Sequence, residues 1–541
     1  MTQEVGTGMD VDPERTIVMA PLRPDTAPSL ASVDRFGAPG SGDLTSDLVA
    51  TSVWSDEMLF AAGIPIVDVP VVSVGGGMGS FVFADYLRTA GVAARDIRIL
   101  TSTESPWDTY EYLTRVSQIP RGERLRSDSQ SCPDNVWGFP AYAIREAWKE
   151  HTLAPLWNVF TEPFLTDYYT PKAGMVFDAL AREAERIGWR SMVAMGQVRT
   201  VRKRSGGGYL TILTPPEGSV PTKRVAFRSR FVHVAVGYPG LRFLPDLQAY
   251  RDRYGDYTRV VNAYSPHEHV YEELRRRPGT VVLRGGGIVA SRILQRLIDD
   301  RDHFGAQTTI VHLFRTYVAG AQGKSIFRRR PGSDGWSYQG FNWPKSAWGG
   351  QDKARMTKLE GQERLDFLES MGGTTTPYRK LWRQQLARGR REGFYRLHVG
   401  IVKDVAPGPD QTVMTRIEQD GTVVEVQANF IIDATGLDAD ISENRVLADL
   451  LQHGGAGRNL SGRLDVERTF EVRGTANDRG RVYAAGMATL GGYYAGVDSF
   501  LGLQYAALAA CDDMAREGFC KRIGVWHSTK HWWKWALNRR I

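Results

Sequence analysis

Two glycine-rich turns, about 210 residues apart, each stand between an apolar segment and an amphipathic one. The motif residues are Gly75, Gly77, Gly79 and Ser80 in the first turn and Gly285, Gly287 and Ala290 in the second. In such a unit the first glycine allows a tight turn, the second lets the backbone approach a pyrophosphate, and the last position must be small because helix and strand touch there. The positive end of the following helix attracts the phosphates. The pattern predicts an α/β chain with two Rossmann-like dinucleotide-binding domains.

The residues after each unit indicate which nucleotide it binds. After the expected strand 96–100 the first acidic side chain is Glu104, which we assign to the ribose hydroxyls. The expected strand 308–314 instead runs into Arg315, and a guanidinium suits the 2′-phosphate that distinguishes NADPH from NADH. The run Arg328 to Arg330 either strengthens this field or forms a solvated face. Two nucleotides in one chain are most economically a flavin that receives hydride and a nicotinamide that donates it, so FAD and NADPH are the expected cofactors.

Length and composition bound the remaining possibilities. A chain of 541 residues exceeds one ordinary core, so at least two domains are expected. No apolar run reaches the roughly 18 residues of a membrane helix, and the polar start of the chain lacks the pattern of a secretory signal. Three widely spaced cysteines supply neither a disulfide framework nor a zinc site, so we expect no metal and a cytoplasmic location. The net charge of +7 suits many anions, and we expect no nucleic-acid partner.

Other segments have recognisable local patterns. Residues 1–60 are rich in Pro, Gly, Ser and Asp without a sustained period, and we expect a flexible leader there. Helical spacing covers 175–187, and 197–213 alternates through a glycine turn as a hairpin does. Near the end, 430–436 and 482–486 are two short strands, each closed by glycine.

This layout resembles the flavoproteins with two dinucleotide-binding domains, in which the NADPH domain is inserted into the FAD domain, and the resemblance covers roughly residues 65 to 525. Residues 235–239 and the strand end Ala434-Thr-Gly436 stand where that family crosses between domains. The segment 264–271, which contains His267 and His269, resembles the linker before the second glycine turn in N-hydroxylating and Baeyer–Villiger-type monooxygenases. This linker is the most specific local match.

The resemblance also implies contacts to the flavin. The segment from Gly486 to Ser499 resembles the closing FAD motif, where a helix N-terminus faces the isoalloxazine carbonyl. Many relatives have Asp after that glycine, whereas this chain has Met487, although Asp498 and Ser499 resemble the N-hydroxylase form. Val198 stands where the family's backbone meets the flavin's adenine.

From the resemblance we expect an FAD domain in two pieces, 65–275 and 425–525, and an inserted NAD(P)H domain at 276–424. The implied activity is that of an FAD- and NADPH-dependent monooxygenase, which oxidises a small organic substrate with O2 through a peroxyflavin. The disulfide reductases share this layout but need a cysteine pair beside the flavin, which the sequence lacks. The Baeyer–Villiger signature string is also absent, which favours N-hydroxylation or a related oxidation.

The catalytic residues are not identified by any motif, and four side chains are weak candidates. His267 and His269 would order the nicotinamide or relay protons, although loop histidines are more often structural. An aromatic-rich stretch after the second unit, from Trp336 through Trp343 and Trp348 to Gln351, would line the substrate pocket or simply pack between domains. We take Trp343 and Gln351 as its candidates.

Two alternatives remain at this point. The tail 526–541 interleaves tryptophan with basic residues, which suits peripheral contact with a lipid headgroup boundary or simply covers the FAD domain. Membrane contact would favour an NAD(P)H:quinone-type reductase of the same layout. Met487 would instead fit a nucleotide-sensing scaffold that has lost turnover.

Overall fold

The computed structural model describes residues 37–125, 130–161, 169–238, 240–317, 335–336, 350–370, 380–437 and 440–541. Arg328 to Arg330, Trp343 and Trp348 lie outside these ranges, so the predictions that rest on them stay untested. Residues 35–541 form one compact unit.

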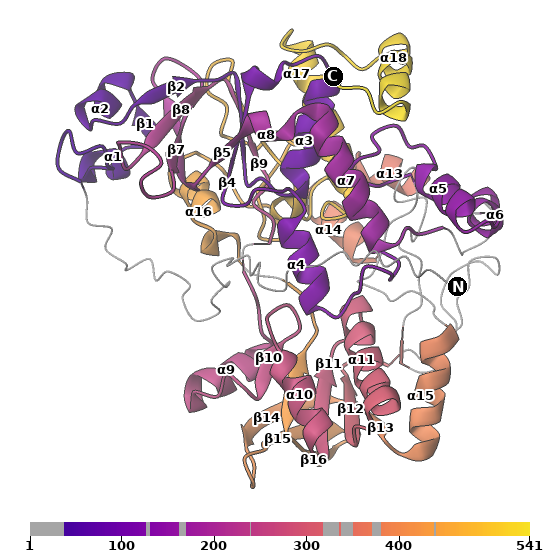
Figure 1. Cartoon of the computed structure of the whole chain (residues 1–541). Coiled ribbons are helices and arrows are strands. Elements are labelled where there is room, and N and C mark those ends of the chain that lie inside the picture. Colours follow the sequence, from indigo (N-terminus) through magenta and orange to yellow (C-terminus); the bar gives the residue numbers. More distant parts are fainter. Residues whose placement is uncertain are drawn as a thin grey trace, which may run out of the picture. The chain divides into compact units, whose positions relative to one another are not determined.

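The first glycine turn belongs to a five-stranded parallel sheet (Figure 1). In spatial order its strands are β18 (Arg481–Ala484), β9 (Phe231–Val234), β3 (Val71–Val74), β4 (Ile97–Thr101) and β5 (Val193–Met195). All four residues of β3 and of β9 are buried, as is typical of a parallel sheet covered on both faces. Apolar residues of α3 (Met78–Thr89), α7 (Ala173–Ile187) and α17 (Phe500–Arg516) form the core with this sheet.

A second sheet of the same domain carries the predicted hairpin. Its order is β1 (Val53–Trp54), β6 (Gln197–Arg204), β7 (Tyr209–Thr214), β8 (Val225–Ser229) and β2 (Ile66–Asp68), and β6 and β7 pair antiparallel as expected. The apolar run 67–74, which reads as one strand in the sequence, is divided between β2 and β3 in different sheets. Pro70 stands at the break, because proline has no N–H to donate to a sheet.

The expected leader 1–60 differs from the structure in the part that is described. Residues 46–61 form α1 (Ser46–Ala50) and α2 (Asp56–Ala61), whose first turns are capped by the side chains of Thr45 and Ser55. Leu48, Trp54 and Leu59 are buried in a cluster with residues of β7 and β8. Pro, Gly and Ser dominate the composition of this region, but a few apolar side chains at the right spacing are enough to fold it onto the hairpin sheet.

The second glycine turn belongs to another five-stranded parallel sheet. Its order is β10 (Val260–Asn262), β17 (Phe430–Asp433), β11 (Gly279–Arg284), β12 (Thr308–Phe314) and β13 (Tyr395–Val399). Strands β14 (Ile401–Pro407), β15 (Val413–Gln419) and β16 (Thr422–Ala428) form an antiparallel sheet between β13 and β17 in sequence. The parallel sheet extends on both sides of the expected limits 276–424, because β10 precedes them and β17 follows them.

The helices of this domain are α9 (Pro245–Tyr254), α10 (Glu268–Arg276), α11 (Ile288–Phe304) and α15 (Lys380–Glu392). The chain between β12 and β13 also contains α13 (Gln351–Met356) and α14 (Gly361–Ser370). The first domain further contains α4 (Asp108–Val116), α5 (Ala141–Lys149), α6 (Ala154–Thr161), α8 (Trp189–Met192) and α16 (Arg445–Gln452).

The tryptophan-rich tail forms α18 (Val525–Ala536), which contacts the first domain. Trp535 donates its indole N–H to the Asp134 carbonyl oxygen (2.9 Å), and Trp532 meets Phe139 edge to face at 5.6 Å. Among the described residues, no helix is long and apolar enough to cross a membrane.

Candidate functional site

The first glycine turn follows β3, and its backbone geometry excludes a side chain at its first position. Gly75 has φ +127°, and a β-carbon there would lie 2.1 Å from the Ala235 carbonyl oxygen at the end of β9. At Gly79 a β-carbon would meet the Ala235 side chain at 2.8 Å, which reflects how closely α3 approaches the sheet. At Gly77, by contrast, a β-carbon would meet nothing within 4 Å. The open space of the fingerprint therefore lies at Gly77, where a pyrophosphate is expected.

The N-terminus of α3 is available to an anion. Gly77 is the N-cap residue and no side chain caps it, so the first-turn N–H groups have no side-chain acceptor at the cap position. Such N–H groups, together with the positive end of the helix dipole, form an anion site.

Ser80 is buried behind the turn rather than exposed in it. Its hydroxyl accepts hydrogen bonds from the Gly76 N–H (3.1 Å) and from the Ser73 hydroxyl (2.9 Å). The Ser73 oxygen also lies 2.9 Å from Nδ1 of His233 on β9. His233 is fully buried and stacks on Phe83 at 4.1 Å, and burial lowers its pKa to about 3. A neutral histidine thus supports the first turn through two hydroxyls.

The second turn repeats this arrangement on β11. Gly285 has φ +124°, and a β-carbon there would lie 2.4 Å from the Ala434 carbonyl oxygen at the end of β17. Gly287 is the uncapped N-cap of α11, and Ala290 is fully buried. The two crossing segments identified in the sequence, at Ala235 and Ala434, therefore each press against one glycine turn. Gly436, which follows Ala434, has φ +133°.

Arg315 and Glu104 occupy corresponding positions in the two units. Arg315 directly follows β12 and is exposed, and it makes no ion pair with any residue that the structure describes. Glu104 follows β4 and is also exposed, while its carbonyl oxygen accepts a hydrogen bond from Trp189 at 3.3 Å. Both side chains stand at the carboxyl edge of their sheets, where nucleotides bind in folds of this kind.

The closing motif lies at the same edge of the first sheet. Gly486 follows β18 and begins a single 3₁₀ turn, Gly486–Thr489. The Ser499 hydroxyl accepts from the Gly502 N–H at 3.0 Å and so caps α17. Asp498 is exposed and accepts a hydrogen bond from the Tyr238 hydroxyl at 3.0 Å. The residues predicted for the flavin thus come from two distant pieces of sequence to one edge.

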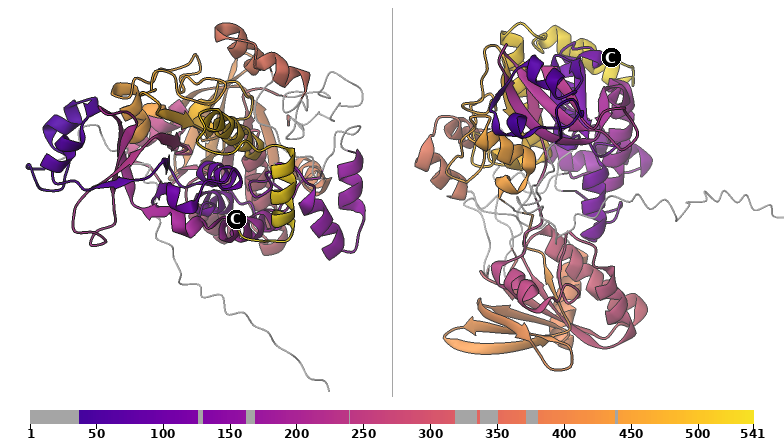
Figure 2. Two further views of the ribbon diagram at one scale, coloured as in Figure 1. Left: turned by 90° about the horizontal axis from the view of Figure 1, so that it is seen from above. Right: turned by 90° about the vertical axis from the view of Figure 1, so that its left-hand side faces the viewer.

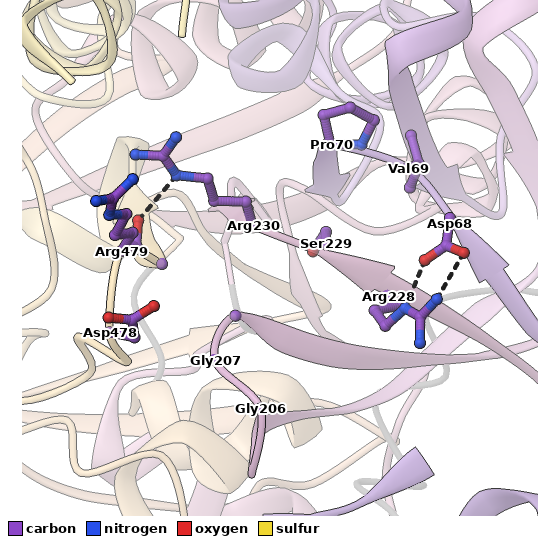
Figure 3. Close-up of a pocket in the computed structure, with 12 residues that line it drawn as sticks. Asp68, Val69, Pro70, Gly206, Gly207, Arg228, Ser229, Arg230, Asp478 and Arg479 are labelled. Atoms are coloured by element: carbon purple, nitrogen blue, oxygen red, sulfur yellow. Dashed lines mark hydrogen bonds and ion pairs between the residues drawn. The ribbon is translucent and has the colours of Figure 1, made fainter. Parts of the chain in front are cut away.

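Two cavities open on the first domain, and only one adjoins this edge. A cavity of about 660 Å³ includes Ser102, Gly196 and Gln197, at the ends of β4 and β5, together with the loop 214–224. Val198, the expected adenine contact, is the next residue of β6. The other cavity, of about 490 Å³, lies at the amino ends of β3, β9 and β18 (Figure 3). Its Arg228 pairs with Asp68 and its Arg230 with Glu517, so those guanidiniums are already used.

The candidate catalytic histidines have structural roles. His267 is buried, its Nδ1 lies 2.7 Å from the Ser265 carbonyl oxygen and its Nε2 lies 2.9 Å from the Tyr271 hydroxyl. Burial lowers the pKa of His267. His269 is exposed, and its Nε2 lies 2.9 Å from the Thr258 carbonyl oxygen. Both rings organise the linker between β10 and α10.

The aromatic stretch is only partly described. Trp336 is fully buried and meets Trp382 edge to face at 4.9 Å and His312 at 4.8 Å. Trp336 is therefore a core residue of the second domain, as the packing alternative expects. Gln351 is exposed at the start of α13, and Trp343 lies outside the described residues.

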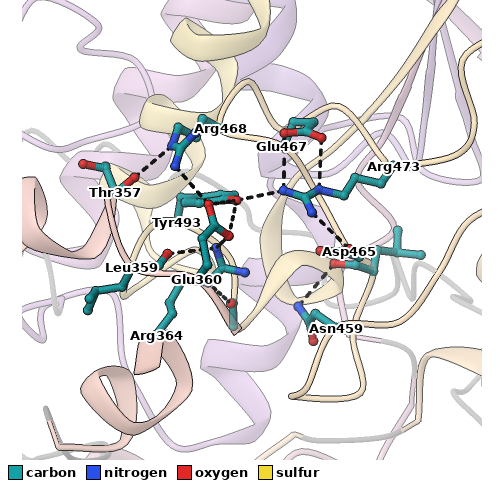
Figure 4. Close-up of polar contacts among 12 residues, drawn as sticks. Thr357, Leu359, Glu360, Arg364, Asn459, Asp465, Glu467, Arg468, Arg473 and Tyr493 are labelled. Carbon is teal, nitrogen blue, oxygen red and sulfur yellow. Dashed lines mark hydrogen bonds and ion pairs between the residues drawn. The ribbon is translucent and has the colours of Figure 1, made fainter. Parts of the chain in front are cut away.

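The helices α13 and α14 dock on the closing piece of the first domain, which the sequence did not indicate. Glu360 accepts hydrogen bonds from the hydroxyl of Tyr493 (2.8 and 2.9 Å) and from Arg468 (2.9 Å), as Figure 4 shows. The Arg364 guanidinium lies over the Tyr493 ring at 4.1 Å and donates to the Gly491 carbonyl oxygen at 3.1 Å. Tyr493 and Gly491 lie between Gly486 and Ser499, so this segment borders the closing motif.

Lys353 on α13 is a second residue that sequence reasoning missed. Its ammonium lies 4.3 Å from the Tyr505 ring and 5.7 Å from the Tyr494 ring, which stack on each other at 4.5 Å. Burial lowers the pKa of Lys353. Only the three-dimensional contact reveals it, because a lone lysine in a polar stretch has no pattern.

Two parallel sheets, each with a glycine turn at its carboxyl edge and one inserted into the sequence of the other, define the fold of the flavoproteins with two dinucleotide-binding domains. No family model matches the chain, and no curated protein matches its sequence.

Solved structures share the fold. The cadaverine monooxygenase from Erwinia amylovora is 13% identical, with 85% of this chain and 97% of that one covered and a TM-score of 0.62. The ornithine N-hydroxylase from Kutzneria sp. 744 is 14% identical, covers 83% and 100%, and has a TM-score of 0.60. The ornithine hydroxylase from Pseudomonas aeruginosa is 15% identical, covers 82% and 98%, and has a TM-score of 0.58. At these identities the likeness shows the fold, and it confirms the predicted fold class.

Proposed function

We propose that the protein is an FAD- and NADPH-dependent monooxygenase that acts on a small organic substrate. The observation that carries this proposal is the pair of glycine turns, each with a backbone position that no β-carbon can occupy and an uncapped helix N-terminus beside it. Two such turns need two dinucleotides. The similar solved enzymes were described with FAD, and one of them with reduced FAD, NADP⁺ and L-ornithine.

The residues that would hold FAD surround the first turn. The N–H groups that follow Gly77 would bind the pyrophosphate, Glu104 would accept from the ribose hydroxyls, and the backbone near Val198 would meet the adenine. The segment from Gly486 to Ser499 would contact the flavin end, with the positive end of α17 toward it. FAD fits here because Gly77 is open while its neighbours in the turn are closely packed.

The residues that would hold NADPH surround the second turn. The N-terminus of α11 would bind the pyrophosphate, and the exposed Arg315 would pair with the 2′-phosphate. We also propose that the inserted domain runs from α9 to β17, because both β10 and β17 pair in its sheet.

When both cofactors are bound, FAD takes hydride from NADPH and then delivers one oxygen atom of O2 to the substrate. The protein's own side chains position the reactants and exclude water. The docked segment with Lys353 and Glu360 would serve this purpose, because it covers the residues next to the closing motif. We propose primary amines as the first substrate class, since the similar enzymes are named for ornithine and cadaverine. The free cysteines support a reducing, cytoplasmic location.

Purified protein tests the proposal directly. Bound flavin should bleach near ~450 nm when NADPH is added without oxygen. Oxygen and an amine should then yield a hydroxylated amine, measured by mass spectrometry, in proportion to the NADPH consumed. Protein that is bleached but returns all electrons to a quinone or as hydrogen peroxide, whichever amine is present, would be a reductase. Protein that binds neither nucleotide would be a scaffold.

A further inference from the structure

Two adjacent helices of the first domain turn apolar side chains toward solvent. On α5, Ile144 and Trp148 are one helical turn apart and are 40% and 83% exposed. At the start of α6 and along it, Leu153, Trp157 and Phe160 follow the same spacing and are 76%, 62% and 70% exposed. Residues at positions i, i+4 and i+7 share one face of a helix, and an apolar face of this kind normally points into a core.

The helix α18 has a similar outward stripe. Trp526, Trp533 and Leu537 share one face and are 89%, 55% and 56% exposed. The opposite face of α18 contacts the domain through the buried His531 and through the Trp535 bond to the Asp134 carbonyl oxygen. The fold therefore seats one face of α18 and leaves three large apolar side chains of the other face without cover.

The three stripes lie on the same side of the domain. Phe139, just before α5, meets Trp532 at 5.6 Å and Trp535 at 6.5 Å, so α18 lies against the start of α5. The views in Figures 1 and 2 show α18 beside α5 and α6. We call this surface the tryptophan face: Ile144, Trp148, Leu153, Trp157, Phe160, Trp526, Trp533 and Leu537.

Exposed apolar residues are common singly, but a surface on which they gather over three helices marks an interaction site. Tryptophan is the side chain most suited to a membrane interface, because its ring is apolar and its N–H is polar. The face has eight large apolar side chains, of which four are tryptophan or lie on α18 beside one.

Charge identifies the partner. Residues 525–541 contain Lys530, Lys534, Arg539 and Arg540 and no acidic residue. Lys530 stands between Trp526 and Trp533 in the same outward stripe, so basic and aromatic side chains alternate along it. Basic side chains near an anionic leaflet strengthen binding by about fivefold each. A symmetric pair of chains would instead bring the same cations together, which opposes self-association through this face.

We propose that the tryptophan face binds the surface of an anionic phospholipid bilayer, with α5, α6 and α18 lying in the interface plane. This inference is independent of the proposed enzymatic function, because none of its residues belongs to the candidate cofactor sites. It extends the lipid contact that the tail suggests to a second, separate element of the first domain.

Vesicle co-sedimentation of the full chain tests the proposal. One set of vesicles contains phosphatidylcholine alone and the other contains equal amounts of phosphatidylcholine and phosphatidylglycerol. We expect binding to the anionic set, weakened by salt, and at least about tenfold weaker binding for the double variant Trp148→Gln with Trp526→Gln. The matched control Phe60→Gln changes an apolar side chain that is 63% exposed on α2, and we expect it to bind as the unaltered protein does. Binding that is absent, or equal for the control and the double variant, overturns the proposal.

Two further measurements keep the result interpretable. Size-exclusion chromatography without lipid would assign the face to a second copy if it showed a concentration-dependent dimer that the double variant abolishes, and this would overturn the lipid proposal. Because the variant could fail to fold, its circular dichroism and thermal midpoint are compared with those of the unaltered protein. Brominated anionic lipids then test the unaltered protein alone, since they should quench its tryptophan emission on contact.

Discussion

His312 holds the second glycine turn from below: its Nε2 lies 2.7 Å from the carbonyl oxygen of Gly285. A carbonyl oxygen only accepts, so Nε2 carries the proton and Nδ1 accepts from the Tyr395 hydroxyl at 3.0 Å. Burial lowers the pKa of His312 to about 4, which keeps the ring neutral. The first turn has the same kind of support from His233 on the strand beside it. Each nucleotide unit thus rests on a neutral, buried histidine.

Replacing His312 by phenylalanine should weaken NADPH binding without loss of flavin. The ring shape is kept, but the Gly285 carbonyl loses its donor, which costs about 1–3 kcal/mol for a buried group. We expect the Kd for NADPH, measured by fluorescence titration, to rise about tenfold while the flavin content stays the same. Tyr395→Phe leaves the bond to Gly285 intact and is the control. An unchanged Kd for the His312 variant would show that the turn holds its shape alone.

The two histidines should also make the fold sensitive to acid. Their folded pKa values, about 3 for His233 and about 4 for His312, lie below the ordinary value of 6.5. Between pH 6.5 and about 4 the unfolded chain therefore binds protons that the folded chain does not. The free energy of unfolding should fall as the pH is lowered through this window, by up to about 1.4 kcal/mol per pH unit for each ring.

Urea unfolding at a series of pH values measures this slope. His233→Gln should make it shallower, whereas His269→Gln, at an exposed side chain, should not. Equal slopes for the unaltered protein and the His233 variant would assign the acid sensitivity to other groups.

The two glycines of the first turn should respond differently to alanine. At Gly75 a β-carbon would overlap the Ala235 carbonyl oxygen at 2.1 Å, and the positive φ adds about 1–3 kcal/mol of strain, so Gly75→Ala should reduce the yield of folded protein. At Gly77 the added carbon meets nothing. Gly77→Ala should therefore melt at the same temperature in the absence of FAD, yet retain less FAD. Normal FAD retention by Gly77→Ala would place the pyrophosphate elsewhere.

The nucleotide units were predictable because their signals are local. A glycine turn between an apolar strand and an amphipathic helix specifies its own structure, so Gly75 and Gly285 lie where the sequence placed them. The limits of the inserted domain were not predictable to the same degree. Whether β17 pairs with β11 or with β3 depends on strand order, and its sequence, an apolar run closed by Ala-Thr-Gly, suits either sheet.

The supporting residues have no local signal at all. His312 stands in an apolar strand, where only the neighbouring turn reveals its role. Glu360 and Tyr493 are 133 residues apart, and no spacing rule connects a glutamate on one element with a tyrosine on another. Composition misled the reading of residues 37–60, because it does not show that Trp54 and Leu59 find a partner sheet.

Arg315 should determine the preference for NADPH over NADH. Its side chain is exposed beside the second turn, and the loss of one charge-assisted pair with a phosphate costs about 1.5–3 kcal/mol. Arg315→Ala should raise the KM for NADPH by about tenfold or more and leave the KM for NADH and kcat nearly unchanged. Arg276→Ala changes another exposed arginine of the same domain, before the amino end of β11, and serves as control. Equal changes with both nucleotides would remove Arg315 from the 2′-phosphate site.

Glu360 should hold the docked segment in place. It joins Arg468 and Tyr493 of the closing piece to Arg364 of its own segment, so its loss leaves the Tyr493 hydroxyl and two guanidiniums with fewer acceptors. The carboxylate is half exposed, so Glu360→Gln should cost only about 1 kcal/mol. Hydrogen exchange measured by mass spectrometry should then be about fivefold faster in the peptide covering α14 and unchanged in α7. Glu363→Gln, at an exposed position on the same helix, should exchange as the unaltered protein does. Faster exchange in both variants would mean that helix propensity, not the contact with Tyr493, controls the segment.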